Sequence, residues 1–332
     1  MGIKHLNRFL RGEAKDATKF VSITEFTGKK IAVDISIYMY KYASDNSLIE
    51  NMYLMLSIFR YYNIIPIFVF DGKSPIEKQE LLQKRRQDKR EAEEEYNILK
   101  VELENNKEIL DESEKQELIY NMDMLKKQFV YIGKNEVQIV KNLIRTYGFT
   151  YYDAPGEADE LCALLTIKGK VWACLSEDMD MFVYGCPRVI RYFSLLNHTA
   201  VLYDLKEILE ILGITQKELR EICILSGTDY NLNMENKDKN NNSKNDPTLY
   251  KTLKYFKKYH KSNSDSEFYD WLTVNTDYIK DYELLKNIYD IFDLSKNHNN
   301  LKTFEHIKII NGPILKDEMR EILKSDGFLF PV

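Results

Sequence analysis

Apolar and polar residues alternate along much of the chain in repeated strand–helix units. Compact apolar runs at residues 31–33, 64–70 and 171–175 are too short for helices and indicate buried strands. Longer segments with helical spacing of apolar residues separate these runs. Strands that alternate with helices form parallel βαβ units, so we predict an α/β protein with a mostly parallel central sheet flanked by helices.

The helical segments follow from the same periodicity. Ile3, Leu6, Phe9 and Leu10 share one face of a short N-terminal helix. A single helix is predicted to carry Tyr38, Tyr40 and Tyr42 and to continue to about residue 62. Further helices are expected after Gly133 and over residues 205–212, 217–225 and 249–261, and a short strand over residues 149–152.

A charged insertion interrupts this pattern. Of the 52 residues from 76 to 127, 26 are charged, which is too many for a core segment. We predict either a solvated helical hairpin or a structure that projects from the sheet toward a partner. Lys78, Arg85 and Lys89 lie at i, i+7 and i+11 and therefore share a helix face. Ion pairing with neighbouring glutamates explains this basic stripe equally well, and both interpretations stay open. The residues that flank it are Lys84, Arg86 and Arg90.

Acidic residues follow the predicted strands. Three strands run directly into an aspartate, and two turns next to them each carry an acidic pair. Ligands bind at the carboxyl ends of parallel strands, so these side chains should lie together. Helix caps and turns explain any single one, but so many carboxylates beside buried segments cost free energy unless a cation neutralises them. We therefore predict a divalent-metal site built from Asp34, Asp71, Glu157, Asp159, Asp178 and Asp180.

The last hundred residues have a different character. Residues 231–248 are rich in asparagine and lysine and are predicted to form a loop. The helix from Leu249 turns Leu249, Leu253 and Phe256 inward and lysines outward, a face that is either solvated or follows a phosphate backbone. The rest of the chain to about residue 323 is expected to be helical and polar. We divide the chain into residues 1–108, 109–132, 133–230, 231–248 and 249–332.

Composition excludes several classes of protein. No apolar run is long enough to cross a bilayer, and no signal peptide is apparent. The four cysteines form no C-x-x-C pair, so a zinc site is not expected and the protein should be intracellular and reduced. A net charge of −5 argues mildly against a general nucleic-acid binder, unless metal ions offset several of the carboxylates.

Six short motifs give the chain a specific resemblance. In order, they are MGI at the N-terminus, VDIS around Asp34, VFDGK around Asp71, APGEAD around Glu157, EDMD around Asp178 and GTDY around Asp229. Together they resemble the flap endonuclease family of structure-specific 5′ nucleases, within the XPG-like superfamily. The resemblance covers residues 1 to about 230.

The resemblance implies a set of roles. The six carboxylates and Asp229, whose simplest explanation is otherwise a turn, would bind two Mg²⁺ ions, for which Mn²⁺ can substitute. Lys78 and Arg85 would be catalytic, acting on the charge that develops at the scissile phosphate. The charged insertion would be the family's helical arch, and the basic helix after Leu249 would bind duplex DNA. The expected DNA contacts are Gly2, Tyr40, Lys84, Lys89, Lys251, Lys254 and Lys258.

Two departures from the family limit this expectation. The loop over residues 231–248 replaces a glycine-rich hairpin that holds potassium in the family, and the C-terminus lacks the glutamine of the usual clamp-binding motif. We therefore expect a monomer that cuts branched or flapped DNA in the nucleus or wherever replication occurs, without support for sliding-clamp binding. The alternatives are a Holliday-junction resolvase, an exoribonuclease, or an inactive DNA-structure-binding paralogue. An aspartate-nucleophile phosphatase lacks its Asp-x-Asp, because Ile35 and Ser36 follow Asp34.

Overall fold

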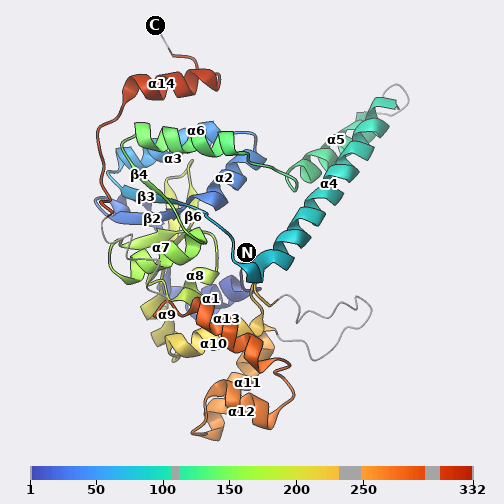
Figure 1. Ribbon diagram of the computed structural model, residues 1–332, viewed down its shortest axis with the longest axis vertical. Coiled ribbons are helices and arrows are strands. Elements are labelled where there is room, and N and C mark those ends of the chain that lie inside the picture. The colour runs from blue at the N-terminus through green and yellow to red at the C-terminus, as the bar shows by residue number, and fades with distance from the viewer. Residues whose placement is uncertain (1, 106–111, 232–247, 296–306, 331–332) are drawn as a thin grey trace.

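The computed structural model describes residues 2–105, 112–231, 248–295 and 307–330. Most of the predicted loop 231–248 therefore lies outside the described residues, as does the altered potassium-binding region. A seven-stranded sheet in the order β1-β7-β6-β5-β2-β3-β4 forms the centre of the molecule (Figure 1). Its strands are β1 Thr18–Ser22, β2 Lys30–Asp34, β3 Ile65–Phe70, β4 Thr150–Asp153, β5 Ala173–Leu175, β6 Arg188–Ser194 and β7 Thr199–Asp204.

The sheet is mostly parallel, which confirms the predicted fold class. Strand β2 lies between β3 and β5 and is parallel to both, and β4 and β6 extend the parallel arrangement on either side. Strands β6 and β7 pair antiparallel, and β1 pairs antiparallel with β7 at the edge of the sheet. These three strands were not predicted. Exposed polar residues interrupt the apolar pattern of β1, and two arginines interrupt that of β6.

Helices cover both faces of the sheet. One core cluster packs residues of α2, α3, α6 and α14 on one face, and the other packs α1 and α7–α13 on the opposite face. The helices on the first face are α2 Ile35–Ser44, α3 Leu48–Tyr61, α6 Lys134–Thr146 and α14 Lys316–Ser325. Those on the second are α1 Leu6–Glu13, α7 Ala158–Ile167, α8 Asp180–Tyr184, α9 Leu205–Leu212, α10 Gln216–Ser226, α11 Leu249–Ser262, α12 Phe268–Asn275 and α13 Tyr282–Phe292.

The predicted single helix to residue 62 is wrong, since α2 and α3 are separate. The polar turn between them contains Asn46 with φ 53°, a left-handed conformation that asparagine tolerates better than most residues and that no helix continues through. The turn leaves Tyr38 and Tyr42 buried on one side of α2 and Tyr40 47% exposed on the other. The exposed part of the Tyr40 ring can therefore meet a ligand.

The charged insertion forms a helical hairpin of α4 Gln79–Asn105 and α5 Glu112–Lys126, which projects away from the body of the protein (Figure 1). A short 3₁₀ turn, Ile76–Lys78, connects β3 to its base. No ion pair joins two residues within the described helix α4, so glutamate pairing does not explain its basic stripe. Tyr96 packs edge-on against Phe129 at 5.4 Å between ring centroids, which helps hold the returning segment beside α4.

The C-terminal segment returns to the sheet. Residues 307–315 are extended rather than helical as predicted, and they run beside β4, where the backbone N–H of Gly312 donates to the carbonyl of Gly148 at 2.7 Å. Helix α14 then packs on α6, and Arg145 pairs with Glu318 at 2.5 Å. No helix in the described ranges is long and apolar enough to span a membrane.

Candidate metal and nucleic-acid site

The carboxyl ends of three neighbouring strands place the predicted aspartates at one edge of the sheet. Strands β2, β3 and β5 are buried almost throughout, so the first polar side chain after each core run emerges where the strand ends. Asp34 is the last residue of β2, Asp71 follows β3, and Asp178 lies in the turn after β5. Glu157 and Asp180 begin α7 and α8, whose N-termini face the same edge and favour negative charge.

The closest acidic group consists of Asp159, Asp178 and Asp180. One carboxylate oxygen from each lies within 4.8 Å of the others. Asp180 is fully buried, and neither of its carboxylate oxygens has a hydrogen-bond partner among the described residues. Burial and the neighbouring carboxylates raise the pKa of Asp159 and of Asp180 well above their usual range. An unpaired buried carboxylate of this kind is costly, and a cation is the partner that would relieve the cost.

Gly2 lies directly against this acidic group. Its φ of 71° is left-handed, and a Cβ there would come within 2.4 Å of an Asp180 oxygen and 2.6 Å of an Asp178 oxygen. Glycine at this position thus meets both a backbone requirement and a lack of space. The family resemblance suggested a DNA contact for Gly2, whereas its contacts in this structure are with the carboxylates.

Asp34 and Asp71 form the next part of the site. The Ser176 hydroxyl donates to Asp34 Oδ2 at 3.0 Å, and the backbone N–H of Ala158 donates to Asp71 Oδ1 at 2.9 Å. Burial, reinforced by the charge of Asp71, raises the pKa of Asp34 to about 8. Ser176 is a site residue that the sequence did not identify, although it lies only two positions before Asp178.

Lys78 closes the side of the site that faces the hairpin. Its buried ammonium donates to Glu157 Oε2 at 2.6 Å and lies 4.7 Å from the centre of the Tyr230 ring. Burial alone would lower the pKa of Lys78, but Asp159, Tyr230 and Glu157 outweigh it and raise the pKa, so the group stays charged. Tyr230 also donates its hydroxyl to Glu157 at 2.8 Å. Tyr230 follows Asp229 in the chain, but nothing in the sequence gave it a role.

The basic stripe of α4 contacts the body of the protein along its length. Arg85 Nη2 pairs with Asp229 Oδ2 at 3.0 Å, so both reach the acidic edge. One turn further, the Lys89 ammonium lies 4.9 Å from the Tyr40 ring and 5.2 Å from the Tyr131 ring and donates to the Val130 carbonyl. Lys78, Arg85 and Lys89 therefore share the face that meets the body, as their spacing predicted.

The remaining expected DNA contacts lie on exposed helix faces. Lys84 is exposed on α4 beside Arg86 and Arg90. On α11, Leu249 and Phe256 are buried as predicted, while Lys254 and Lys258 are exposed and Lys251 is half-exposed. The Lys258 ammonium lies over the Tyr255 ring at 5.4 Å. These lysines are separate from the acidic edge and suit backbone contacts rather than chemistry.

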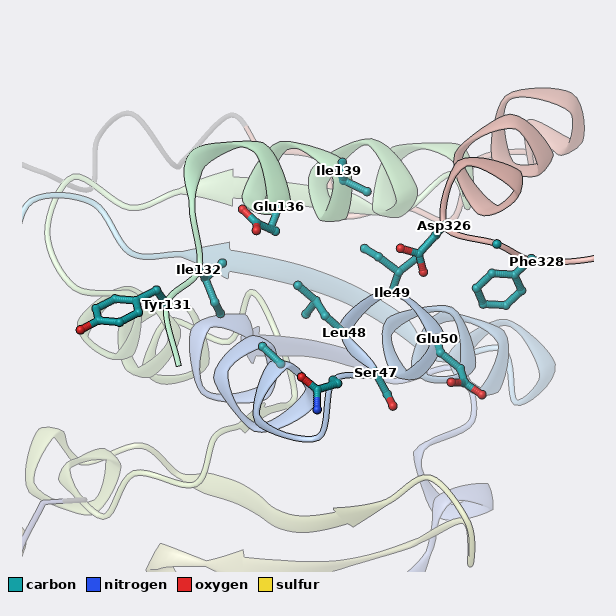
Figure 2. A pocket seen from close by; sticks show the side chains of 13 residues that line it. Ser47, Leu48, Ile49, Glu50, Tyr131, Ile132, Glu136, Ile139, Asp326 and Phe328 are labelled. Carbon is teal, nitrogen blue, oxygen red and sulfur yellow. The ribbon is translucent and has the colours of Figure 1, made fainter. Parts of the chain in front are cut away.

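A hollow of about 630 Å³ lies away from the acidic edge, between the α2–α3 turn, the start of α6 and the C-terminal segment (Figure 2). Figure 2 shows Glu50, Glu136 and Asp326 around it with Tyr131 and Phe328. Its lining contains these three acidic residues and neither lysine nor arginine. A phosphate group would be repelled there, so this hollow is not part of the candidate site.

The acidic edge fits a divalent cation. Its donors are carboxylate oxygens, the ligands preferred by hard cations such as Mg²⁺, Ca²⁺ and Mn²⁺. Neither oxygen of Asp180 has a hydrogen-bond partner among the described residues, and one of them lies within 4.8 Å of an oxygen of Asp159 and of Asp178, as a ligand atom for a cation would. The seven predicted carboxylates are linked through neighbouring charges. Lys78 pairs with Glu157 and Arg85 with Asp229, and the charge of Lys78 also acts on Asp159 and Asp180, whose pKa values nevertheless stay raised.

Comparison with known proteins decides the family. The XPG N-terminal domain matches residues 1–92 and the XPG I-region matches residues 148–229, which together make up more than half of the chain. The chain belongs to the XPG family. Flap endonuclease 1-A of Xenopus laevis is 29% identical over 248 residues, and flap endonuclease 1 of Methanococcus aeolicus is 31% identical over 230 residues. These matches cover 69% and 64% of this chain, and 61% and 66% of the relatives.

Solved XPG-family structures share the fold. The catalytic core of Rad2 in complex with DNA substrate superposes with a TM-score of 0.65 at 20% identity, covering 98% of this chain and 95% of the catalytic-core chain. Flap endonuclease-1 from Methanococcus jannaschii gives 0.53 at 21% identity, covering 93% of this chain and 97% of that structure. Both XPG regions contain predicted ligands, with Asp34 and Asp71 in the first and the other five in the second.

Proposed function

We propose that this protein is a structure-specific 5′ flap endonuclease and 5′→3′ exonuclease that hydrolyses DNA phosphodiester bonds with two divalent ions, Mg²⁺ or in its place Mn²⁺. The observation that carries the proposal is the acidic edge, where Asp159, Asp178 and Asp180 converge within 4.8 Å. Two cations at the base of the helical hairpin, Lys78 and Arg85, pair with carboxylates of the same edge. A nuclease needs this pairing of cation ligands with positive charge, because its substrate is a polyanion.

Asp34, Asp71, Glu157, Asp159, Asp178, Asp180 and Asp229 would hold the ions. When bound, such ions polarise the phosphodiester and lower the pKa of the attacking water. The chain itself orients the ligands through Ser176 on Asp34, the Ala158 N–H on Asp71, and the Asp180 N–H, which donates to Asp178 at 3.0 Å. These fixed donors hold carboxylates in place before any ion arrives.

Lys78 and Arg85 would act on the substrate from the base of α4. Lys78 is held as a cation, so it can stabilise negative charge on the phosphate but cannot serve as a general base at neutral pH. Arg85 is exposed apart from its pair with Asp229, so its remaining donors can reach a phosphate. Tyr40, on the neighbouring face of α2, supplies an exposed ring on which a base can stack.

The substrate would be branched or flapped DNA at sites of replication and repair. We propose that the α4–α5 hairpin receives the single-stranded 5′ end, with contacts from Lys84 and Lys89, and that Lys251, Lys254 and Lys258 of α11 follow the duplex backbone. The exposure of Lys84, Lys254 and Lys258 supports this division, with residues 249–332 contributing the duplex-binding part. The protein would act as a monomer.

The decisive experiment uses a 5′-labelled double-flap substrate, on which the cleavage position is mapped with and without Mg²⁺. We expect cleavage at the base of the 5′ flap by the wild type and none by Asp178→Ala. Absence of cleavage by the wild type, or equal cleavage by the variant, would overturn the proposal. Binding of the flap without turnover in either Mg²⁺ or Mn²⁺ would instead identify an inactive DNA-structure-binding protein.

The same assay separates the related activities. A four-way junction and a single-stranded RNA of matched length are compared with the flap under identical conditions. Faster cleavage of the junction would indicate a resolvase, and faster cleavage of the RNA an exoribonuclease. Adding potassium to the flap reaction tests whether duplex binding retains a potassium dependence.

A further inference from the structure

Arg191 lies behind the acidic group in a position that no predicted role explains. It is on β6, only 6% exposed, and its two terminal nitrogens donate in different directions. Nη1 donates to Asn7 Oδ1 at 2.8 Å and also contacts the Met179 sulfur, and Nη2 donates to the Glu177 carbonyl at 2.7 Å. One guanidinium therefore joins α1 to the turn that carries Asp178 and Asp180.

The same turn is held from a second direction by Glu177. Its carboxylate accepts the backbone N–H of Tyr192 at 2.6 Å and the hydroxyl of Tyr38 at 3.4 Å, and its Oε2 lies 3.6 Å from Arg191 Nε. Tyr192 adopts a φ of 54° where the β6–β7 register shifts. A non-glycine residue in the left-handed region is uncommon, and a bulge of this kind often redirects a side chain near a functional site.

Asn7 completes the network on the side of α1. Its Oδ1 also accepts the hydroxyl of Tyr203 at 2.8 Å, and its Nδ2 donates to the hydroxyl of Tyr192 at 2.7 Å. Asn7 lies five residues after Gly2, whose backbone occupies the space beside Asp178 and Asp180. The network thus fixes two pieces of chain, the N-terminal segment and the 176–180 turn, on either side of the same carboxylates.

We propose that Arg191 is a positioning residue for the metal site and that Asn7 is its partner in this role. This proposal rests on the proposed two-ion function: Arg191 would hold Asp178 and Asp180 at the spacing that divalent ions require. Residues that orient metal ligands from behind commonly change metal affinity about 10–100-fold when removed. The guanidinium suits the task because its fixed geometry reaches the Glu177 carbonyl and the Asn7 amide together.

The sign of the effect distinguishes positioning from simple electrostatics. Replacing Arg191 with methionine removes a positive charge close to the acidic group. If only charge mattered, the carboxylates would then attract a cation more strongly, and Mg²⁺ would bind more tightly. If Arg191 positions the ligands, Mg²⁺ must bind more weakly despite the more negative surroundings. Asn7→Ala changes no charge and should also weaken binding.

The test measures Mg²⁺ binding by calorimetry, and Mn²⁺ binding by electron paramagnetic resonance, in the full-length protein without DNA. We expect affinity to fall about tenfold in Arg191→Met and in the same direction in Asn7→Ala. Arg60→Met is the matched control, because Arg60 also donates to backbone carbonyls, those of Tyr147 and Gly312, on the opposite face of the sheet. Its metal affinity should equal that of the wild type.

Unchanged or tighter binding in Arg191→Met would overturn the inference, and so would an equal loss in Arg60→Met, which would indicate a general effect of lost stability. Should Arg191→Met fail to fold, the Mg²⁺ affinity of Asn7→Ala decides: weaker binding than the wild type supports the inference, and unchanged or tighter binding overturns it. Failure of the proposed nuclease function has a different signature. The wild type would then bind ions in these experiments and leave flap DNA uncut.

Discussion

Replacing Asp180 with asparagine should make the metal-free protein more stable while removing its response to Mg²⁺. Asp180 is fully buried, its oxygens lack hydrogen-bond partners in the described structure, and Asp159 and Asp178 lie within 4.8 Å. Without a cation, ionised Asp180 is therefore repelled by its neighbours and poorly solvated. Asparagine has nearly the same shape and no charge, so it removes the repulsion without leaving a cavity.

The magnitude follows from the geometry. Two like charges 4.8 Å apart repel by about 3.5 kcal/mol at an effective dielectric constant of about 20. Unfolding entropy of about 2.1 cal/mol/K per residue gives roughly 0.7 kcal/mol/K for a chain of 332 residues. Relief of one such pair should therefore raise the Tm by about 5 °C at a pH where both carboxylates are ionised.

The pH dependence gives the prediction its sign. The folded-state pKa of Asp180 is raised above its unfolded value, first by burial and then by Asp178. The contribution of Asp180 to stability is therefore fully present at pH values below its pKa in the unfolded chain, about 3.9. It is lost as the pH rises through the higher pKa of Asp180 in the folded protein. Asp34, with a pKa raised to about 8, acts in the same direction. In EDTA, the Tm advantage of Asp180→Asn should be near zero at acidic pH and grow toward pH 9.

The assay is thermal unfolding followed by circular dichroism, in EDTA and then in excess Mg²⁺. Ion binding should raise the Tm of the wild type and have little effect on Asp180→Asn, because binding to the folded state alone stabilises it. An asparagine variant that is less stable than the wild type at every pH would refute the reasoning. So would a wild-type Tm in EDTA that does not respond to pH between 6 and 9.

Three further changes have expected outcomes. Lys78→Met should slow flap cleavage about 100-fold with little change in flap affinity, because the variant loses the buried cation that would stabilise the scissile phosphate. Lys100→Met, at an exposed position of α4, is the control and should leave the cleavage rate unchanged, with single-turnover rates as the measurement for both. Gly2→Ala should weaken Mg²⁺ binding, measured by calorimetry, because its Cβ would collide with Asp180. Tyr40→Ala should lower flap affinity about tenfold in fluorescence anisotropy, and Tyr40→Phe should not, because stacking needs only the ring.

The fold and the convergence of the acidic side chains at one edge of the sheet could be predicted because each depends on local sequence. Strands buried on both faces appear as uninterrupted apolar runs, and the aspartates that end them must meet where parallel neighbours end. The edge strand β1 was missed because exposed residues break its apolar pattern, and β6 was missed because Arg188 and Arg191 interrupt its apolar residues. The α2–α3 break depends on one left-handed asparagine, a feature that a long helical periodicity conceals.

Other parts of the site depend on contacts between distant segments. Tyr230 reaches Glu157 across 73 positions, and Arg191 reaches Asn7 across 184. An isolated arginine or tyrosine in a strand or loop has many uses, so nothing local distinguishes these two. Gly2 is a related case, because the motif indicated that the residue matters while only its packing against Asp178 and Asp180 gives the physical reason.

The distribution of charge around the acidic edge links the hairpin to the metal site. Lys78 and Arg85 are both at the base of α4, where they pair with Glu157 and Asp229. The charge of Lys78 also acts on Asp159 and Asp180, but burial and the neighbouring carboxylates keep the pKa of both raised. The fixed positive charges thus lie at the base of the hairpin, and bound cations would balance the negative charge that remains. A displacement of α4 that broke both ion pairs would leave two more carboxylates uncompensated and raise the free energy of the whole group. The acidic edge therefore favours the hairpin position in which Lys78 and Arg85 stay paired with Glu157 and Asp229.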